Sequence, residues 1–233
     1  MRRCFVLLVC LLVTGAGGLV GACSGPSAKA PADPRAALKA AKQRLDATRT
    51  VRFRVTSAGL PKSGAVLVSG DGVAKRPASF SGRFRVGTGG AAVSLHVVSL
   101  DGTLYTEVPF TDRFVATDPG DLGVPDPARL LDPAHGLSSF LTGGTKVTKV
   151  GRSRSGSEVV EQFSARLPAK AVGRILYVAD PSGMIETNFF VVDGSMQLRK
   201  ATFRGPFYGK GTMTTYTVVL DRYGAPATIS KPS

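Results

Sequence analysis

VRFRVTS, residues 51–57, alternates between apolar and polar side chains. Successive side chains of a β-strand point to opposite faces of a sheet. Val51, Phe53 and Val55 therefore share one face, and two arginines and a threonine occupy the other. A strand with one buried and one solvated face is typical of an antiparallel sheet.

The same alternation continues on both sides of this stretch. It recurs in SFSGRFRVG (79–87) and AVSLHVVS (92–99), and again in TKVTKVGR (145–152), SEVVEQFSARLP (157–168), IETNFFVVDGSMQLRKATFR (185–204) and GTMTTYTVVLDRYG (211–224). Asp-Gly pairs at 71–72, 101–102 and 193–194 are hairpin-turn signals. Residues 51–116 are therefore predicted to form a meander, and the whole chain to contain about ten strands.

Helical signals are fewer and shorter. Asp33-Pro34 supplies an N-cap and a first helical residue, and Leu38, Ala41 and Leu45 follow at helical spacing, so a helix is predicted to about residue 47. DPARLLDPAHGLSSFLTGG (126–144) has two Asp-Pro starts, each predicting a short helix, the last ending at 143–144. PAKAVGRILYV (168–178) also predicts a helix.

These elements predict an α+β fold. A sheet this wide curls instead of staying flat, and helices must cover its concave apolar side. Three or four short helices leave part of that side for an internal apolar cavity, which suits an apolar ligand. The alternative is a filled core.

The N-terminus predicts export and lipidation. Two arginines precede an uncharged run from residue 5 to 22, as in a signal peptide, and a retained membrane span is the alternative. VGAC (20–23) resembles a bacterial lipobox, which implies that Cys23 receives a diacylglyceryl group and becomes the new N-terminus. The other cysteines, Cys4 and Cys10, lie inside the signal. We expect residues 1–22 to be the signal peptide, 23–33 the lipidated cysteine and a flexible linker, and 34–233 a single domain.

Net charge and the predicted export limit the classes of binding partner that we expect. The whole chain carries a formal net charge of +14. A basic surface at a membrane attracts anionic head groups, although scattered, solvated charges explain the same count. An exported protein is not expected to bind nucleic acid.

Catalytic and metal-binding signatures are missing from the sequence. The two histidines, His96 and His135, are far apart, no Gly-x-Ser-x-Gly or Ser-x-x-Lys motif occurs, and no cluster has metal-site spacing. The sequence therefore predicts a protein that is not an enzyme, with no cofactor and no metal. A structure in which either histidine meets a serine and an aspartate in a cleft would revive the enzyme hypothesis.

An ordered set of motifs resembles a known family. LDGTLYTEVPF (100–110), DPARLLDPAHGLSSFL (126–141) and KVGRSRSGSEVVEQFSARLPAKAV (149–172) occur in the order seen in the LppX/LprA/LprF/LprG lipoproteins of mycobacteria and relatives. The resemblance implies a strongly curved antiparallel half-barrel with helices on its concave side, similar to the LolA/LolB carriers. It also implies a deep apolar cavity for acyl chains of cell-envelope lipids or glycolipids. This chain has no tryptophan, and Phe189 or Phe190 and Tyr223 stand where the family usually has one.

The hypothesis is thus a lipid carrier held on the extracytoplasmic face of the cell membrane. We expect a monomer, with a membrane exporter as a candidate partner. The competing hypothesis is a non-catalytic module that docks its basic face on an envelope polymer or a membrane protein. Cavity-lining candidates come from the apolar strand faces and the covering helices: Val55, Leu67, Phe84, Val93, Leu95, Leu104, Leu130, Leu137, Phe140, Leu141, Ile175, Phe189, Val191 and Phe203. The alternation marks burial and not what covers each residue, so each candidate is also a candidate for plain core.

Overall fold

The computed structural model describes residues 33–232 except 89, 110, 112 and 120–124. Within them the chain forms one antiparallel sheet with helices on one face, which confirms the predicted α+β half-barrel. The strands are β1 (Thr50–Ala58), β2 (Val66–Lys75), β3 (Ser79–Thr88), β4 (Ala91–Leu100), β5 (Thr103–Glu107), β6 (Phe114–Thr117), β7 (Thr145–Ser155), β8 (Glu158–Pro168), β9 (Met184–Val192), β10 (Leu198–Gly205) and β11 (Thr214–Asp221). The helices are α1 (Pro34–Asp46), the 3-10 helix η1 (Pro127–Leu131), α2 (Leu137–Gly143) and α3 (Ala169–Val172).

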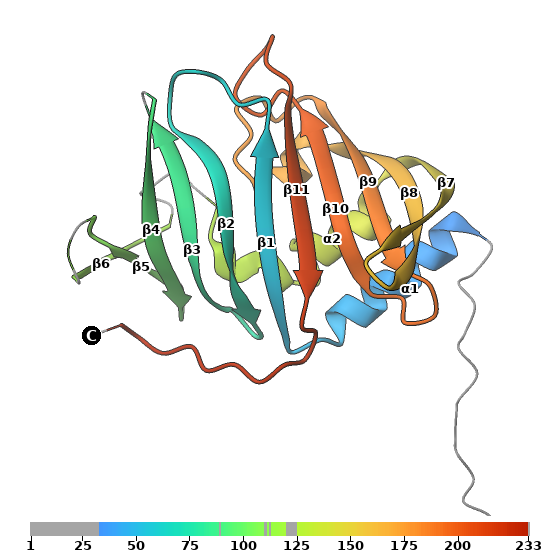
Figure 1. Cartoon of the computed structure of the whole chain (residues 1–233), viewed down its shortest axis with the longest axis horizontal. Helices are drawn as coiled ribbons and strands as arrows, with labels where there is room; N and C mark the ends of the chain where they lie inside the picture. Colours follow the sequence, from blue (N-terminus) through green and yellow to red (C-terminus); the bar gives the residue numbers. More distant parts are fainter. Residues whose placement is uncertain (1–32, 89, 110, 112, 120–124, 233) are drawn as a thin grey trace, which may run out of the picture.

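The strand order is β6-β5-β4-β3-β2-β1-β11-β10-β9-β8-β7, so the sheet consists of two meanders joined at the β1–β11 pair. The first and last strands of the chain meet in the middle, and β6 and β7 form the two open edges. The chain passes from β6 to β7 through η1 and α2, which run across one face of the sheet (Figure 1). This connection places the helices on the concave side.

The first helix follows its sequence signals. The Asp33 carboxylate accepts hydrogen bonds from the backbone N–H of Arg35 and Ala36, and Pro34 occupies the first helical position. The apolar stripe that includes Leu38 and Leu45 is buried against the sheet side of the molecule. The predicted helix is therefore confirmed, with its end at residue 46.

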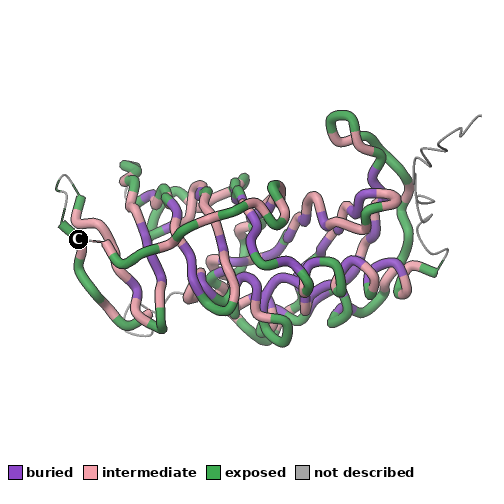
Figure 2. The backbone as a smooth tube through the Cα atoms, turned by 90° about the horizontal axis from the view of Figure 1, so that it is seen from below, coloured by how far each residue is buried: buried purple, intermediate pink, exposed green. Residues whose placement is uncertain are grey.

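Strand directions define two ends of the half-barrel. At the upper end β1, β3, β8 and β10 finish and β2, β4, β9 and β11 begin; the lower end holds the opposite termini (Figure 1). Buried residues gather over the middle of the sheet, whereas its two edges, β5–β6 and β7, are mostly half-buried or exposed (Figure 2). The cover on the concave face is thus uneven.

The Asp-Gly pair at 101–102 forms the predicted tight turn. Asp101 and Gly102 both have positive φ and connect Leu100 to its partner Thr103, as a type I′ hairpin requires. The pair at 193–194 also lies in a turn, between β9 and β10.

The predicted turn at Asp71-Gly72 is wrong, because both residues lie in the middle of β2. Asp71 is the cross-strand neighbour of Arg54 on β1 and of Arg83 on β3, and opposite charges across strands favour pairing. A Cβ on Gly72 would lie 2.4 Å from the Ser81 carbonyl oxygen, so the close approach of two strands, and not a turn, requires this glycine.

The second Asp-Pro start does not open a helix. Asp132 accepts hydrogen bonds from the N–H of Ala134 and His135 and closes a single turn, and α2 begins only at Leu137. A Cβ on Gly136 would approach three carbonyl oxygens of the preceding segment within 2.6 Å. Close packing against η1 therefore separates the two helices. The predicted end of α2 at 143–144 is confirmed.

The helix predicted over residues 168–178 is much shorter in the structure. α3 ends at Val172, and the chain continues in turns. Helix-type backbone hydrogen bonds continue only to Leu176, and the N–H of Ala179 then donates to the carbonyl oxygen of Phe207, so the end of this segment is held by the β10–β11 connection. Tertiary contact has overridden local helix preference here.

The described contacts form a closed unit. The hydrophobic core extends from Ala37 to Leu220, and the described hydrogen bonds begin at Asp33. Residues 33–232 therefore contain their own core, and the division of the whole chain into signal peptide, linker and domain stays a prediction. The predicted signal peptide and Cys23 lie outside the described residues. None of the described helices is both long and apolar enough to cross a membrane.

Candidate functional site

The predicted lining residues lie together on the concave side. Those on strands share the face that holds Val55, by the register of neighbouring strands, and the others lie on η1, α2 and the segment after α3. Nine are buried: Val55, Leu104, Leu130, Leu137, Phe140, Leu141, Phe189, Val191 and Phe203. These nine belong to the filled core, as the contact between the Phe140 and Phe203 rings illustrates, with 5.7 Å between their centroids.

The other five predicted residues are only half-buried: Leu67, Phe84, Val93, Leu95 and Ile175. Cross-strand register places Val86 between Leu67 and Val93, and pairs Phe84 with Leu95. Leu67, Val86 and Val93 lie at the upper end of β2, β3 and β4, and Phe84 and Leu95 lie near the middle of their strands. Burial thus separates the concave face into a filled part and a half-buried apolar part, which we call the upper apolar site.

Aromatic rings form the floor of this site. The Phe80 and Phe84 rings stack at 5.6 Å between centroids, and Phe53 lies 5.3 Å from Phe80. A Cβ on Gly70 would lie 2.4 Å from the Phe84 ring, so the glycine lets the ring lie flat on β2. Phe84 therefore marks the point where the filled core gives way to the half-open site.

Tyrosines from the β10–β11 connection form a side wall. The Tyr208 hydroxyl accepts a hydrogen bond from the N–H of Leu67 at 2.8 Å and shares a short hydrogen bond with the Tyr216 hydroxyl. Burial raises the pKa of the Tyr216 hydroxyl well above its ordinary value, and the hydrogen bond to Tyr208 raises it further. The first contact ties the loop 206–213 to the start of β2, and the second ties it to β11.

The segment after α3 completes this wall. The Tyr177 ring stacks on Tyr208 with 5.8 Å between centroids, and Ile175 and Val178 pack against the core. Sequence reasoning assigned residues 168–178 to a helix and did not select Tyr177 or Tyr208. The only signal for Tyr208 was its place in the glycine-rich stretch GPFYGKG, which predicts a loop and not a wall.

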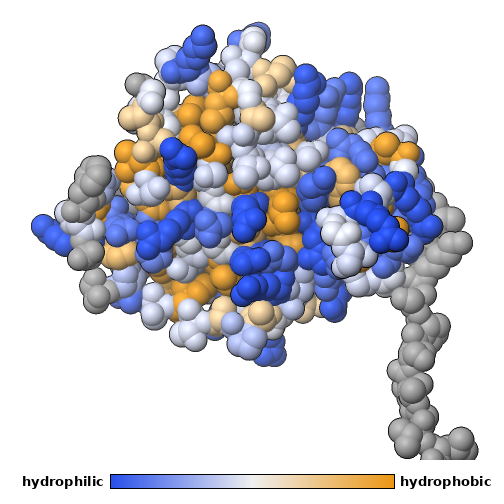
Figure 3. All heavy atoms as spheres, viewed as in Figure 1, coloured by the Kyte–Doolittle hydropathy of each residue, from blue (hydrophilic) through white to orange (hydrophobic). Residues whose placement is uncertain are grey.

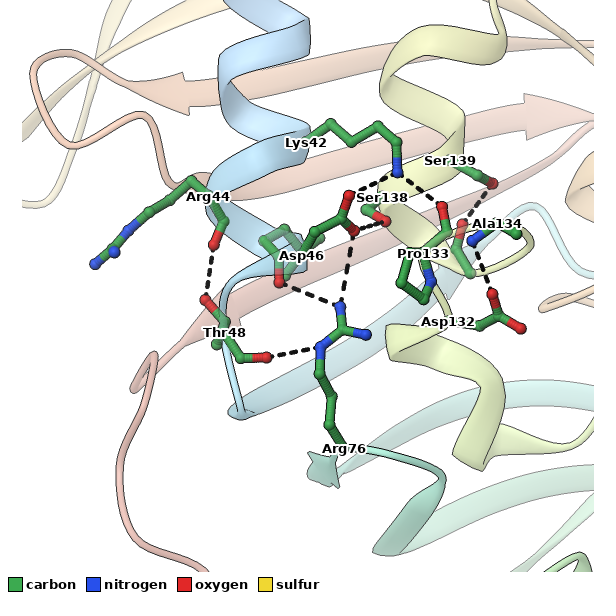
Figure 4. Close-up of polar contacts among 12 residues, drawn as sticks. Lys42, Arg44, Asp46, Thr48, Arg76, Asp132, Pro133, Ala134, Ser138 and Ser139 are labelled. Atoms are coloured by element: carbon green, nitrogen blue, oxygen red, sulfur yellow. Dashed lines mark hydrogen bonds and ion pairs between the residues drawn. The ribbon is translucent and has the colours of Figure 1, made fainter.

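The lower end of the concave side is closed by a polar cluster (Figure 4). Asp46 accepts hydrogen bonds from Lys42 Nζ at 2.7 Å and from Ser138 Oγ at 2.6 Å. Arg76, from the β2–β3 hairpin, donates to the Thr48 carbonyl oxygen and reaches the Asp46 carboxylate at 3.7 Å. Helices α1 and α2 are thus joined to the sheet at this end.

The β7 edge is also closed, by charge. Glu161 faces the concave side with a side chain only 2 % exposed, and its Oε1 accepts from Lys149 at 2.7 Å and from Arg152 at 3.1 Å. Arg152 also donates to Asp193. Polar contacts thus cover the concave side at its lower end and near β7, away from the upper apolar site.

A separate hollow in the described part of the structure has a polar lining. A hollow of about 350 Å³ lies near the β7 edge, and it is lined by Lys146, Ser164, Ala165, Arg166, Glu186, Thr187 and Asn188. Its lining is polar and belongs mainly to the convex face. It does not adjoin the upper apolar site.

Neither histidine combines with a serine and an aspartate among the described residues. His96 Nε2 is 3.3 Å from Ser81 Oγ, on the convex face, and its ring packs edge-on against Phe114. His135 Nδ1 is 3.6 Å from the Asp132 carboxylate in an exposed turn. Among described residues, no three histidine, cysteine or acidic side chains gather as metal ligands.

Comparisons with known proteins agree with this architecture. The model of the LppX_LprAFG lipoprotein family matches residues 33–228. A protein named lipoarabinomannan carrier protein LprG, from Mycobacterium tuberculosis, is 23% identical over 239 residues, covering 99% of this chain and 97% of its own; the Mycobacterium bovis protein matches equally.

Solved structures of two further lipoproteins share the fold. LprF from Mycobacterium bovis superposes with a TM-score of 0.70 at 17% identity, covering 88% of this chain and all of its own. LppX from Mycobacterium tuberculosis gives 0.60 at 11% identity, covering 84% and 97%.

Proposed function

The chain belongs to the LppX_LprAFG lipoprotein family, and we propose that it carries cell-envelope lipids or glycolipids by binding their acyl chains in the upper apolar site. The observation that carries the proposal is the half-burial of Leu67, Phe84 and Leu95 above a core that is otherwise filled. Apolar side chains on the inner face of a sheet are ordinarily covered. An acyl chain would supply the missing cover.

Binding is driven by burial of apolar surface. Transfer of apolar surface from water is worth about 25 cal/mol per Å², or about 0.8 kcal/mol per methylene. Bonds are neither made nor broken in such a cycle, and carriage across the envelope needs only an opening that admits and releases the chain. A relative named as a lipoarabinomannan carrier supports a glycolipid as the cargo class.

The same proposal places the protein at the cell membrane. If Cys23 carries a diacylglyceryl group, the domain is held on the extracytoplasmic face by a linker of residues 24–33. Two or more acyl chains give stable anchoring where one is marginal. The protein then collects or delivers lipid within reach of its own membrane, with an exporter as a candidate partner.

The test is native mass spectrometry of the soluble chain 24–233, purified without detergent, together with uptake of a fluorescent lipid. We expect co-purified lipid masses and saturable uptake, and an excess of unlabelled lipid should compete. Ions at the lipid-free mass alone, with no uptake, would contradict the proposal.

A further inference from the structure

The upper end carries exposed apolar side chains beside the site. Tyr177, Met184 and Met213 are 48%, 44% and 45% exposed. They are half of the large apolar side chains that are exposed in the described part of the chain. Exposed apolar side chains that gather at one end of a molecule indicate an interaction surface, whereas single scattered ones do not.

Backbone contacts place these three residues on one rim. Tyr177 stacks on Tyr208 on the concave side of the rim. The carbonyl of Met213 adjoins Gly59 at the end of β1, and Met184 opens β9 opposite Pro168. All three therefore lie at the end of the half-barrel where the upper apolar site is half-open.

Basic side chains surround them. The β1–β2, β8–β9 and β10–β11 connections at this end carry four exposed cations: Lys62, Lys170, Arg174 and Lys210. The acidic side chain among these connections, Asp180, accepts hydrogen bonds from the N–H and Oγ of Ser182, which lower its pKa and occupy one of its oxygens. The rim thus combines apolar tips with an excess of positive charge.

We propose that this rim docks on an anionic phospholipid bilayer. Tyrosine favours the membrane interface, exposed methionines add apolar area, and lysine and arginine are attracted to anionic head groups. The proposal rests on the proposed function, because docking by the rim brings the upper apolar site to a lipid surface. The linker 24–33 reaches at most about 35 Å when extended, enough to let an anchored domain tilt onto its rim.

The convex face is the natural comparison. Hydrophilic and apolar side chains are mixed on it (Figure 3), and it carries Arg83 and Arg85, both exposed. Their replacement changes net charge by the same amount as replacement of Lys170 and Arg174. A difference between the two pairs therefore reports the place of docking and not the total charge.

The experiment is sedimentation of the soluble chain 24–233 with vesicles of phosphatidylglycerol or of phosphatidylcholine at low salt. We expect wild type to bind phosphatidylglycerol at least tenfold more tightly. Lys170→Glu with Arg174→Glu should weaken that binding by about tenfold or more, since each basic residue near the surface contributes severalfold. Arg83→Glu with Arg85→Glu should weaken it less than threefold.

A second pair of variants tests the apolar tips. Met184→Ser with Met213→Ser should weaken vesicle binding severalfold. The matched control is Val115→Ser with Val150→Ser, which removes equally exposed apolar side chains from β6 and β7 and should leave binding unchanged. Thermal unfolding of every variant checks that each one folds.

Several outcomes would overturn docking by the rim. One is equal binding of wild type to phosphatidylglycerol and phosphatidylcholine. Another is an equal loss of vesicle binding in the Lys170/Arg174 and Arg83/Arg85 variants. A third is binding that survives both the Lys170/Arg174 and the Met184/Met213 substitutions. A larger loss in the convex pair would instead assign docking to the convex face. Uptake of a fluorescent fatty acid without vesicles is measured in parallel: if uptake persists while rim docking fails, only this inference falls, and if uptake alone fails, the carrier function falls.

Discussion

The Asp46 carboxylate on α1 accepts a hydrogen bond from Ser138 Oγ on α2 at 2.6 Å, and Ser138 is fully buried. Arg76 of the β2–β3 hairpin approaches the same carboxylate. One side chain therefore joins both covering helices to the sheet at the lower end.

Asp46→Ala should destabilise the fold by about 1–3 kcal/mol, because it leaves the buried Ser138 hydroxyl without its partner. The free energy of unfolding in urea measures the effect. Lys39→Ala, on the exposed side of α1, is the control and should change stability by less than about 0.5 kcal/mol. Equal effects of the two substitutions would show that the cluster has no structural role.

The seam between the two meanders should show acid sensitivity. Arg52 on β1 donates two hydrogen bonds to Asp221 on β11, and they lower the pKa of the Asp221 carboxyl below its ordinary value of 3.8. A depressed folded-state pKa gives stability that is present above about pH 4 and is lost as the pH falls through the folded value.

Asp221→Asn should therefore be less stable than wild type at pH 6, and the difference should shrink toward pH 2. Urea midpoints across this range measure it. Arg52→Gln should remove the same pH-dependent component. A difference that stays constant down to pH 2 would mean that the pair does not contribute as described.

Cys23→Ser should abolish lipidation and leave an uncleaved or soluble product, with the domain unaffected. The physical reason is that the lipobox interpretation makes the Cys23 thiol the acyl acceptor, and residues 24–233 contain no other cysteine. Membrane fractionation after a high-salt wash measures anchoring, and the salt removes protein held by charge alone. A variant that stays with the membrane as wild type does would refute the lipobox interpretation.

Period-2 patterns predicted the strands and their buried faces, because alternation is a local property. They did not predict that Arg52 and Asp221, 169 positions apart, would pair at the centre of the sheet. Asp71-Gly72 shows the opposite failure, where a strong local turn signal yields to arginines on both neighbouring strands. Non-local pairing decided both results.

The sequence predicted only part of the site, because the rest of the site also depends on non-local contacts. Alternation selected Phe84 and Leu95 and also Phe189 and Phe203, since each needs an apolar environment. It could not show that the second pair is buried, with Phe203 against Phe140 of α2, while the first pair is only half-buried. Tyr208 escaped selection because its role depends on a hydrogen bond to Leu67, on a distant strand.

Truncation should separate core from site. Phe203→Ala removes a fully buried ring and should cost about 3–5 kcal/mol of stability. Phe84→Ala removes a half-buried ring and should cost about 1–2 kcal/mol, yet lower lipid uptake severalfold. Unfolding in urea and uptake of a fluorescent lipid measure the two effects. Equal stability losses, with uptake unchanged in Phe84→Ala, would place Phe84 in the filled core.

Filling is the converse test. Val93→Trp adds a large ring on the concave face where the cover is incomplete, so it should block lipid uptake while the melting temperature changes little. Val191→Trp adds the same ring where the side chain is only 1% exposed, so overpacking should cost about 1–3 kcal/mol. The two variants make the same replacement on the same face of the sheet, and they differ only in how completely the position is buried. If Val93→Trp loses stability and uptake together, position 93 lies in packed core and the upper apolar site must be redrawn without it; if uptake alone is lost, an acyl chain occupies the space beside Val93.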